Sequence, residues 1–290
     1  YVCSLRIKIT YSFIFLKINF SQYFCFIILH KIFSIVKMNL KFIESDLEQW
    51  AQLSSDRNPI HFDEVFAKKN GLDGCIVHGM LAMLPMKEIF TEQNKKNSQY
   101  NHIKIFLKKS VPLNKELSYS HINNKIMLKS NDEHLYSSKI TYLAENPPTE
   151  VKKESIPISS FISKKDLKEK YIKFKKLNKQ TENNILFWDS ILFSIYISNN
   201  KNSPLSHNVS DLLKRENLKP ESYVVFQIEH SLTIFNNNVD LSIENIDCIS
   251  YSLIGGDLIR IENNIYASII LYLYFTPNSY MKAGFPPTVC

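Results

Sequence analysis

The feature that most constrains the fold is a change of hydrophobic period near residue 100. Residues 79–90 are apolar on nearly every side, which predicts a buried helix, and Pro85 inside this run predicts a kink or an early break. Beyond residue 100 the pattern becomes strand-like, with turn residues at Asn123-Asn124 and Asn131-Asp132. The order of a buried helix and then an antiparallel meander predicts an α+β unit.

The second half of the chain repeats this plan without visible sequence identity. Residues 184–197 predict another apolar helix. Strand-like runs follow it at residues 223–234, 239–249, 251–261 and 265–275. Two units, each a buried helix wrapped by an antiparallel sheet, indicate an internal duplication. We place the first unit at residues 38–148, a linker at 149–160, where the apolar period is lost, and the second unit at 161–290.

Residues 1–37 stand apart by composition. They hold five basic residues and no acidic one, and they show no steady helical or strand period. They also lack the small-residue cleavage pattern of a secretory signal. We expect a non-native or disordered N-terminal extension, with Met38 as the start of the protein. The alternative is a basic, apolar segment that lies on a membrane surface.

Composition restricts the class of protein and its partners. The formal net charge is +7, but residues 38–290 hold 30 basic and 28 acidic residues, so the body of the chain is nearly neutral and does not favour nucleic acid. Five cysteines without a C-x-x-C pair favour a reducing compartment, and we expect a cytoplasmic location. No apolar run approaches the roughly 18 residues that a membrane span needs, so stable membrane insertion is not expected.

Two short stretches carry the residues for chemistry: S-S-D-R-N-P-I-H at 54–61 and I-V-H-G-M-L at 76–81. A proline turn separates Asp56 from His61 and can direct both side chains to one point, where they can remove a proton from water and return one. Gly79 begins the buried helix, so its free amide and the helix dipole can face a carbonyl oxygen that gains negative charge. This set contains a base, an acid and an oxyanion donor, but no nucleophile and no metal site.

Each of these residues also has an ordinary structural interpretation. Asp56 by itself fits a turn residue, His61 a packed or surface histidine, and Gly79 a tight helix entry. We expect His78 to orient the loop before Gly79 rather than to act as an acid or a base. The lysine-rich run at 164–176 is interpreted as a solvated helix face, with a phosphate contact as the alternative.

The two stretches resemble the signature of the MaoC-like (R)-specific enoyl-CoA hydratases and acyl dehydratases, which have the hot-dog fold. The resemblance is specific over about residues 45–90 and loose at residues 111–117. It implies a double hot-dog whose second unit is degenerate and catalytically silent, because that unit has no D-x-N-P-x-H sequence. It also implies that the acyl chain lies between the units, with room for a longer chain where the second site is lost.

By this resemblance Asp56 and His61 are the catalytic pair, the Gly79 amide binds the thioester oxygen, and Asn58 and His78 support the site. The implied reaction of fatty acid metabolism hydrates a trans-2-enoyl-CoA to a (3R)-3-hydroxyacyl-CoA, reversibly and without a cofactor or metal. The alternatives are a 3-hydroxyacyl-ACP dehydratase of lipid or polyketide synthesis and a non-catalytic acyl-thioester-binding protein. The expected partner is an acyl-CoA or acyl-ACP thioester, and a homodimer is an open alternative.

Two positions depart from the family pattern. Ser55 stands where the family usually has glycine or an acid before the aspartate. Lys87 stands where some members have a serine, eight residues after the oxyanion glycine. We therefore expect the auxiliary role of that serine to be absent and the pocket wall to differ.

Overall fold

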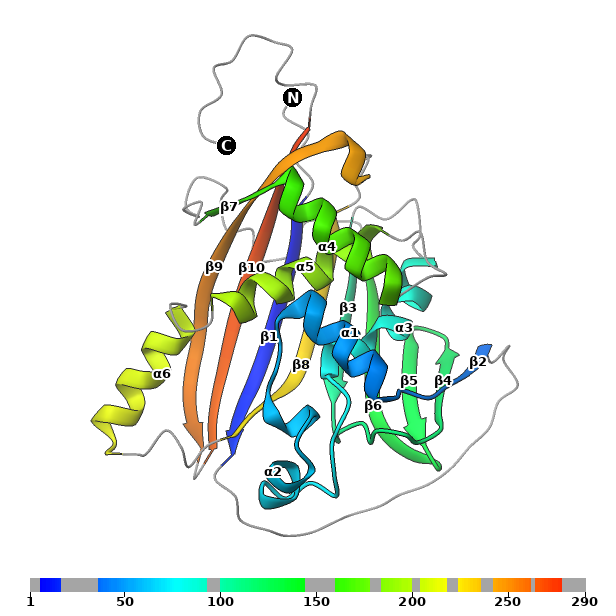
Figure 1. The fold of residues 1–290 in the computed structure, drawn as a ribbon, viewed down its shortest axis with the longest axis vertical. Coiled ribbons are helices and arrows are strands. Elements are labelled where there is room, and N and C mark those ends of the chain that lie inside the picture. Colours follow the sequence, from blue (N-terminus) through cyan, green and yellow to red (C-terminus); the bar gives the residue numbers. More distant parts are fainter. Residues whose placement is uncertain are drawn as a thin grey trace.

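The strands of the protein form one antiparallel sheet. The structure is a computed structural model, and it describes residues 6–16, 36–92, 100–143, 160–177, 184–199, 204–217, 224–235, 242–261 and 264–277. The sheet has ten strands in the order β2-β4-β5-β6-β3-β8-β1-β10-β9-β7. Helices α1, α4 and α5 cross in front of the strands in the view of Figure 1. The predicted α+β class, with helices packed on an antiparallel sheet, is confirmed.

The first half contributes one end of this sheet. Its helices are α1 (Glu44–Ser54), α2 (Glu64–Lys69) and α3 (Gly79–Glu92). Its strands are β2 (Val36–Leu40), β3 (Tyr100–Leu107), β4 (Leu117–Ile122), β5 (Lys125–Ser130) and β6 (Glu133–Leu143). The expected meander is present, and Asn123, Asn131 and Asp132 adopt the positive φ that its tight turns require. Helix α3 continues through Pro85, so the early break is not observed.

The second half follows the same spatial order. Its helices are α4 (Lys164–Leu177), α5 (Asn184–Ser198) and α6 (Pro204–Arg215). Its strands are β7 (Ser160–Ser163), β8 (Val224–Phe235), β9 (Ile246–Ile261) and β10 (Asn264–Pro277). In both halves the first strand lies outermost, the third and fourth follow, and the second lies innermost. This repetition is consistent with a double hot-dog, while the predicted domain boundaries stay a prediction.

The first half contributes five strands to the sheet, and the described part of the second half contributes four. Strand β1 (Arg6–Leu16) adds a fifth strand to the second half's end of the sheet. It pairs antiparallel with β8 on one side and with β10 on the other. The composition of residues 1–37 predicted a segment outside the fold, whereas the structure places residues 6–16 within the sheet. Both partners of β1 are more than 200 residues away along the chain, so no local pattern could reveal the pairing.

Helix α1 begins after its N-cap Ile43, whose N–H donates to the Asp46 carboxylate at 2.9 Å. One further local prediction differs from the structure. The runs 239–249 and 251–261 were expected to be two strands, but residues 246–261 form the single strand β9. Residues 144–159, which hold most of the predicted linker, lie outside the described part of the chain.

The core lies between the sheet and the two central helices, α3 and α5. Almost every side chain of both helices is buried, from Met80 to Phe90 and from Leu186 to Tyr196. Helix α1 packs against α4 and α5, and α3 contacts α5. In the described part of the chain, no helix is long and apolar enough to cross a membrane.

An ion pair joins the two central helices inside this core. The Lys87 ammonium of α3 contacts the Asp189 carboxylate of α5, and both side chains are fully buried. The second oxygen of Asp189 lies 3.2 Å from Nε2 of His230 on β8. Burial opposes ionisation of Asp189, but Lys87 and His230 together lower the pKa of this carboxyl to about 2. Burial, followed by the charge of Lys87, lowers the pKa of His230 to about 4, and burial also lowers the pKa of Lys87 against the opposing charge of Asp189.

Deleting residues 1–35 tests whether β1 belongs to the fold. The deletion leaves β8 and β10 without their shared partner, so we expect lower stability and more aggregation through the exposed strand edges. Urea unfolding followed by circular dichroism, together with size-exclusion chromatography, measures both effects. A deletion of residues 1–5, which keeps β1, is the control. Equal urea midpoints for the full chain and the chain lacking residues 1–35 would contradict this placement of β1.

Candidate active site

The site begins where α1 ends. Ser55 follows the last helical residue and adopts a left-handed conformation with φ of 64°. A residue with a side chain adopts this conformation at a cost, and glycine adopts it freely, which explains why glycine fits this position of the signature. The buried Ser54 hydroxyl then accepts the N–H of Asp56 at 3.1 Å. Asp56 is thereby held just outside the end of the helix.

Asn58 and Pro59 shape the loop between Asp56 and His61. The Asn58 N–H donates to Oδ1 of Asp56 at 3.2 Å, and Oδ1 of Asn58 accepts the N–H of Ile60 at 3.3 Å. A short 3-10 turn, Pro59–His61, follows. Two successive side-chain-capped turns shape this loop, and one ligand atom of Asp56 and one of His61 lie within 4.8 Å of each other. The role expected for Asn58, to shape the loop, agrees with these contacts.

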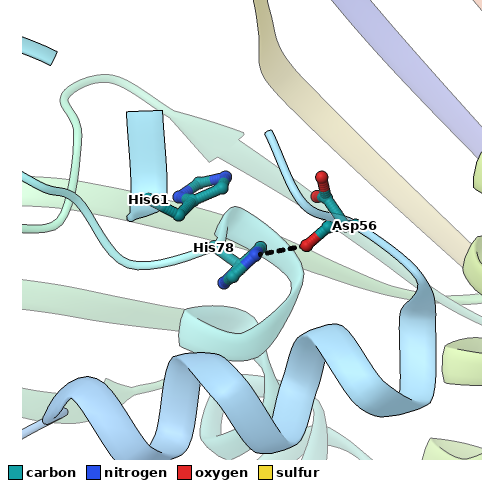
Figure 2. A group of neighbouring side chains, drawn as sticks. All are labelled: Asp56, His61 and His78. Atoms are coloured by element: carbon teal, nitrogen blue, oxygen red, sulfur yellow. Dashed lines mark hydrogen bonds between the residues drawn. The ribbon is translucent and has the colours of Figure 1, made fainter. Parts of the chain in front are cut away.

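His61 and His78 stack on each other beside Asp56. Their ring centroids are 3.7 Å apart and their planes differ by 25°. Figure 2 shows the three side chains together. Nδ1 of His61 lies 2.8 Å from the carbonyl oxygen of Ile76, which can only accept, so Nδ1 donates and Nε2 of the neutral ring is left as an acceptor. Nε2 of His78 donates to the backbone oxygen of Asp56 at 3.1 Å. This contact fits the expectation that His78 orients the loop.

Burial controls the charges in this group. Burial raises the pKa of the Asp56 carboxyl, although His61 and the Asn58 N–H oppose this shift. Burial lowers the pKa of His61 in spite of Asp56 and the Ile76 carbonyl, and burial followed by repulsion from His61 lowers the pKa of His78 to about 2. Both imidazoles are therefore neutral near pH 7. A neutral imidazole with a free Nε2, close to a carboxyl group, is suited to accept a proton from water.

Gly79 is the first residue of α3 and lies next to this group. A methyl group at Gly79 would lie 2.9 Å from Cδ2 of Leu107 and 3.3 Å from Oε1 of Gln227, so little space is left above the helix start. The first amides of a helix have no partner within the helix, and the dipole is positive at this end. The start of α3 can therefore stabilise an oxygen that gains negative charge beside Asp56 and His61.

Three residues outside the two signature stretches interact with residues of the site or of the start of α3, and the sequence interpretation missed them. Gln227 lies on β8 of the second half, and its Nε2 lies 3.8 Å from the sulfur of Met80 and 3.3 Å from the backbone oxygen of Glu229. The Tyr136 hydroxyl of β6 would lie 3.7 Å from a methyl group at Gly79. Burial, followed by the charge of Asp56, raises the pKa of the Tyr196 phenol on α5. No motif marks these positions, because only the tertiary fold brings them to the loop.

Asp56, His61 and His78 are also the group that is most suitable for a metal ion among the described residues. One ligand atom from each lies within 4.8 Å of the other two. A tetrahedral ion needs lone pairs that converge on one point, and the lone pairs of an imidazole lie in the ring plane. The two rings are stacked face to face and nearly parallel, so they do not converge in this way. The arrangement fits proton transfer better than chelation.

Part of the chain is similar to known proteins. Residues 32–134 match the family model described as MaoC like domain. The chain is similar to two mitochondrial 3-hydroxyacyl-[acyl-carrier-protein] dehydratases, with 42% identity to FERN of Solanum lycopersicum and 38% to the protein of Arabidopsis thaliana, each over 51 residues. These matches cover 18% of this chain and 31% of each relative, so the chain spans less than a third of the length of these curated relatives.

A solved structure is also similar to part of the chain. It is the (R)-hydratase from A. caviae involved in PHA biosynthesis, with 20% sequence identity and a TM-score of 0.32, over 39% of this chain and 97% of the hydratase. The loop with Asp56 and His61 and the start of α3 both lie within the segment that the family model matches. The match to the MaoC-like family model thus includes both signature stretches.

Proposed function

We propose that the chain is a hydro-lyase that adds water reversibly to a trans-2-enoyl thioester and gives a (3R)-3-hydroxyacyl thioester. One observation carries this proposal. A buried carboxyl group and a neutral imidazole with a free Nε2 lie close together, next to the first amide of the buried helix α3. The (3R) outcome follows from the family resemblance. The match of residues 32–134 to the MaoC-like model supports the reaction class.

In the proposed mechanism one water molecule lies between Asp56 and His61. Nε2 of His61 and the Asp56 carboxylate accept its two hydrogen bonds, which orients an oxygen lone pair toward C3 of the enoyl group. As the water oxygen bonds to C3, one water proton passes to the pair and a proton is delivered from the pair to C2. The thioester oxygen gains negative charge in between, and the Gly79 N–H at the start of α3 stabilises it. Dehydration is the reverse of these steps.

The carrier of the acyl group separates two candidate substrates. The sequence signature favours a CoA thioester, whereas the names of the two plant relatives give a substrate attached to acyl-carrier protein. A direct comparison of kcat/KM for crotonyl-CoA and crotonyl-ACP decides between them.

The compartment of the protein is a second open choice, because the sequence predicts the cytoplasm and the names of the two plant relatives give the mitochondrion. Imaging of the tagged full chain distinguishes the two locations.

Asp56→Asn and His61→Gln test the catalytic pair. Each removes one proton acceptor with little change in shape, so we expect kcat for crotonyl-CoA hydration to fall by about 10²- to 10⁴-fold. Loss of absorbance of the enoyl thioester measures the rate, and chiral chromatography identifies the product. Asp211→Asn and His207→Gln, which make the same changes at exposed positions of α6, are the matched controls. Wild-type rates in the first two variants would favour a non-catalytic thioester-binding protein.

Gly79→Ala tests the proposed oxyanion position. The added methyl group meets Leu107 and Gln227 in the space above the helix start, so we expect it to disturb the docking of the thioester oxygen and to lower kcat/KM by about tenfold or more. Gly74→Ala is the control, since a methyl group there has no atom within 4 Å. Thermal unfolding of both variants separates a local effect from loss of the fold. Unchanged kcat/KM in Gly79→Ala would argue against a close contact at this helix start.

The pH profile of hydration tests the protonation states. Both members of the pair must be unprotonated to accept protons from water, and protonation of either one removes an acceptor. Because burial lowers the pKa of His61 and raises that of Asp56, we expect kcat/KM to fall as the pH is lowered, with apparent pKa values that belong to the coupled pair. No decrease on the alkaline side is expected from this pair. Steady-state rates between pH 5 and pH 9, with circular dichroism at each pH, provide the measurement. A rate that increases toward acid would contradict this assignment.

A further inference from the structure

The two central helices meet through a charged contact that the proposed reaction does not use. Lys87 of α3 and Asp189 of α5 are both fully buried, and the described structure gives this pair no exposed surface. The Lys87 ammonium also lies 3.7 Å from the sulfur of Met80. Met80 directly follows Gly79, and its sulfur contacts Gln227 on the other side. A continuous row of contacts thus leads from the start of α3 to the interface between α3 and α5.

The position of the reacting atoms decides which end of the substrate faces the contacts that lead from Met80 to Lys87 and Asp189. If the thioester oxygen is at Gly79 and C3 is between Asp56 and His61, the carrier must leave toward solvent because it is too large for the interior. The acyl chain beyond C3 must then point inward, past Met80 and toward α5. There it meets Lys87 and Asp189, whose side chains are both fully buried.

We propose that the Lys87–Asp189 ion pair closes the interior end of the acyl site and limits this protein to short-chain substrates. The proposal rests on the proposed function for the location of the acyl chain. A longer chain has to separate two charges that have no water to replace their contact, and this loss exceeds the gain from burying a few methylene groups. The inference reverses the expectation from the sequence that loss of a second site leaves room for a longer chain.

The experiment compares enoyl-CoAs of four to twelve carbons. We expect kcat/KM of the wild-type protein to fall by about tenfold or more between the four- to six-carbon and the ten-carbon substrates. Lys87→Met combined with Asp189→Leu replaces the pair by apolar side chains of similar size, which usually preserves folding. We expect this double variant to raise kcat/KM for the ten-carbon substrate relative to crotonyl-CoA by a similar factor. Lys109→Met combined with Glu133→Leu removes an exposed ion pair by comparable substitutions and is the control with an unchanged profile.

Calorimetric binding of butyryl-CoA and decanoyl-CoA separates this inference from the proposed reaction, since it needs no turnover. Tighter binding of butyryl-CoA to the wild-type protein supports the limit on chain length even if no hydration occurs. Equal binding of the two thioesters, tighter binding of decanoyl-CoA, or no binding of either overturns it. Equal wild-type kcat/KM for short and long enoyl-CoAs also overturns it. If the double variant does not fold, the wild-type profile and the binding comparison still decide the question.

Discussion

The pairing of β3 with β8 is the interaction on which the rest of the structure depends. Residues Tyr100–Phe106 of β3 pair antiparallel with residues Glu229–Phe235 of β8, and this ladder joins the two halves into one sheet. Because each half carries its central helix over its own strands, joining the strands also brings α3 against α5. The ladder therefore places Gln227 of the second half beside the start of α3 at Gly79, and His230 beside Asp189 of α5. The second half thus forms part of the surroundings of the site even though it lacks the signature.

The site and the helix interface both bury polar groups that contact a partner. Asp56 accepts the N–H of Asn58, and His61 donates to the carbonyl of Ile76, so neither is buried without a partner. Lys87 and Asp189 compensate each other in the same way. Removing only one member of such a buried charge pair leaves the other uncompensated and typically costs about 3–5 kcal/mol. The two groups differ in their available atoms. The loop leaves Nε2 of His61 available to accept a proton, whereas Lys87 and Asp189 contact each other.

The local pattern was sufficient to predict much of the first half. The turns of the meander and the buried nature of α3 follow from side-chain period and turn chemistry, which act over a few residues. The shape of the D-x-N-P-x-H loop has a related origin, since Ser54, Asp56 and Asn58 each accept an N–H two residues further on, while the catalytic roles of the site residues stay a prediction. The structure adds why two of its positions are constrained. Ser55 occupies a left-handed turn, and Asn58 caps the turn that carries His61.

What the sequence by itself determined is therefore the short-range part of the protein: the helix–meander order, the repeated plan, and the D-x-N-P-x-H loop followed by His78 and Gly79. Only the tertiary structure decided which strands lie next to each other, that residues 6–16 pair with β8 and β10, and that Lys87 meets Asp189 across 102 positions of sequence. The physical reason is one of range. Backbone turns and side-chain period depend on neighbours along the chain, whereas strand pairing and charge compensation in a core depend on groups that only folding brings into contact.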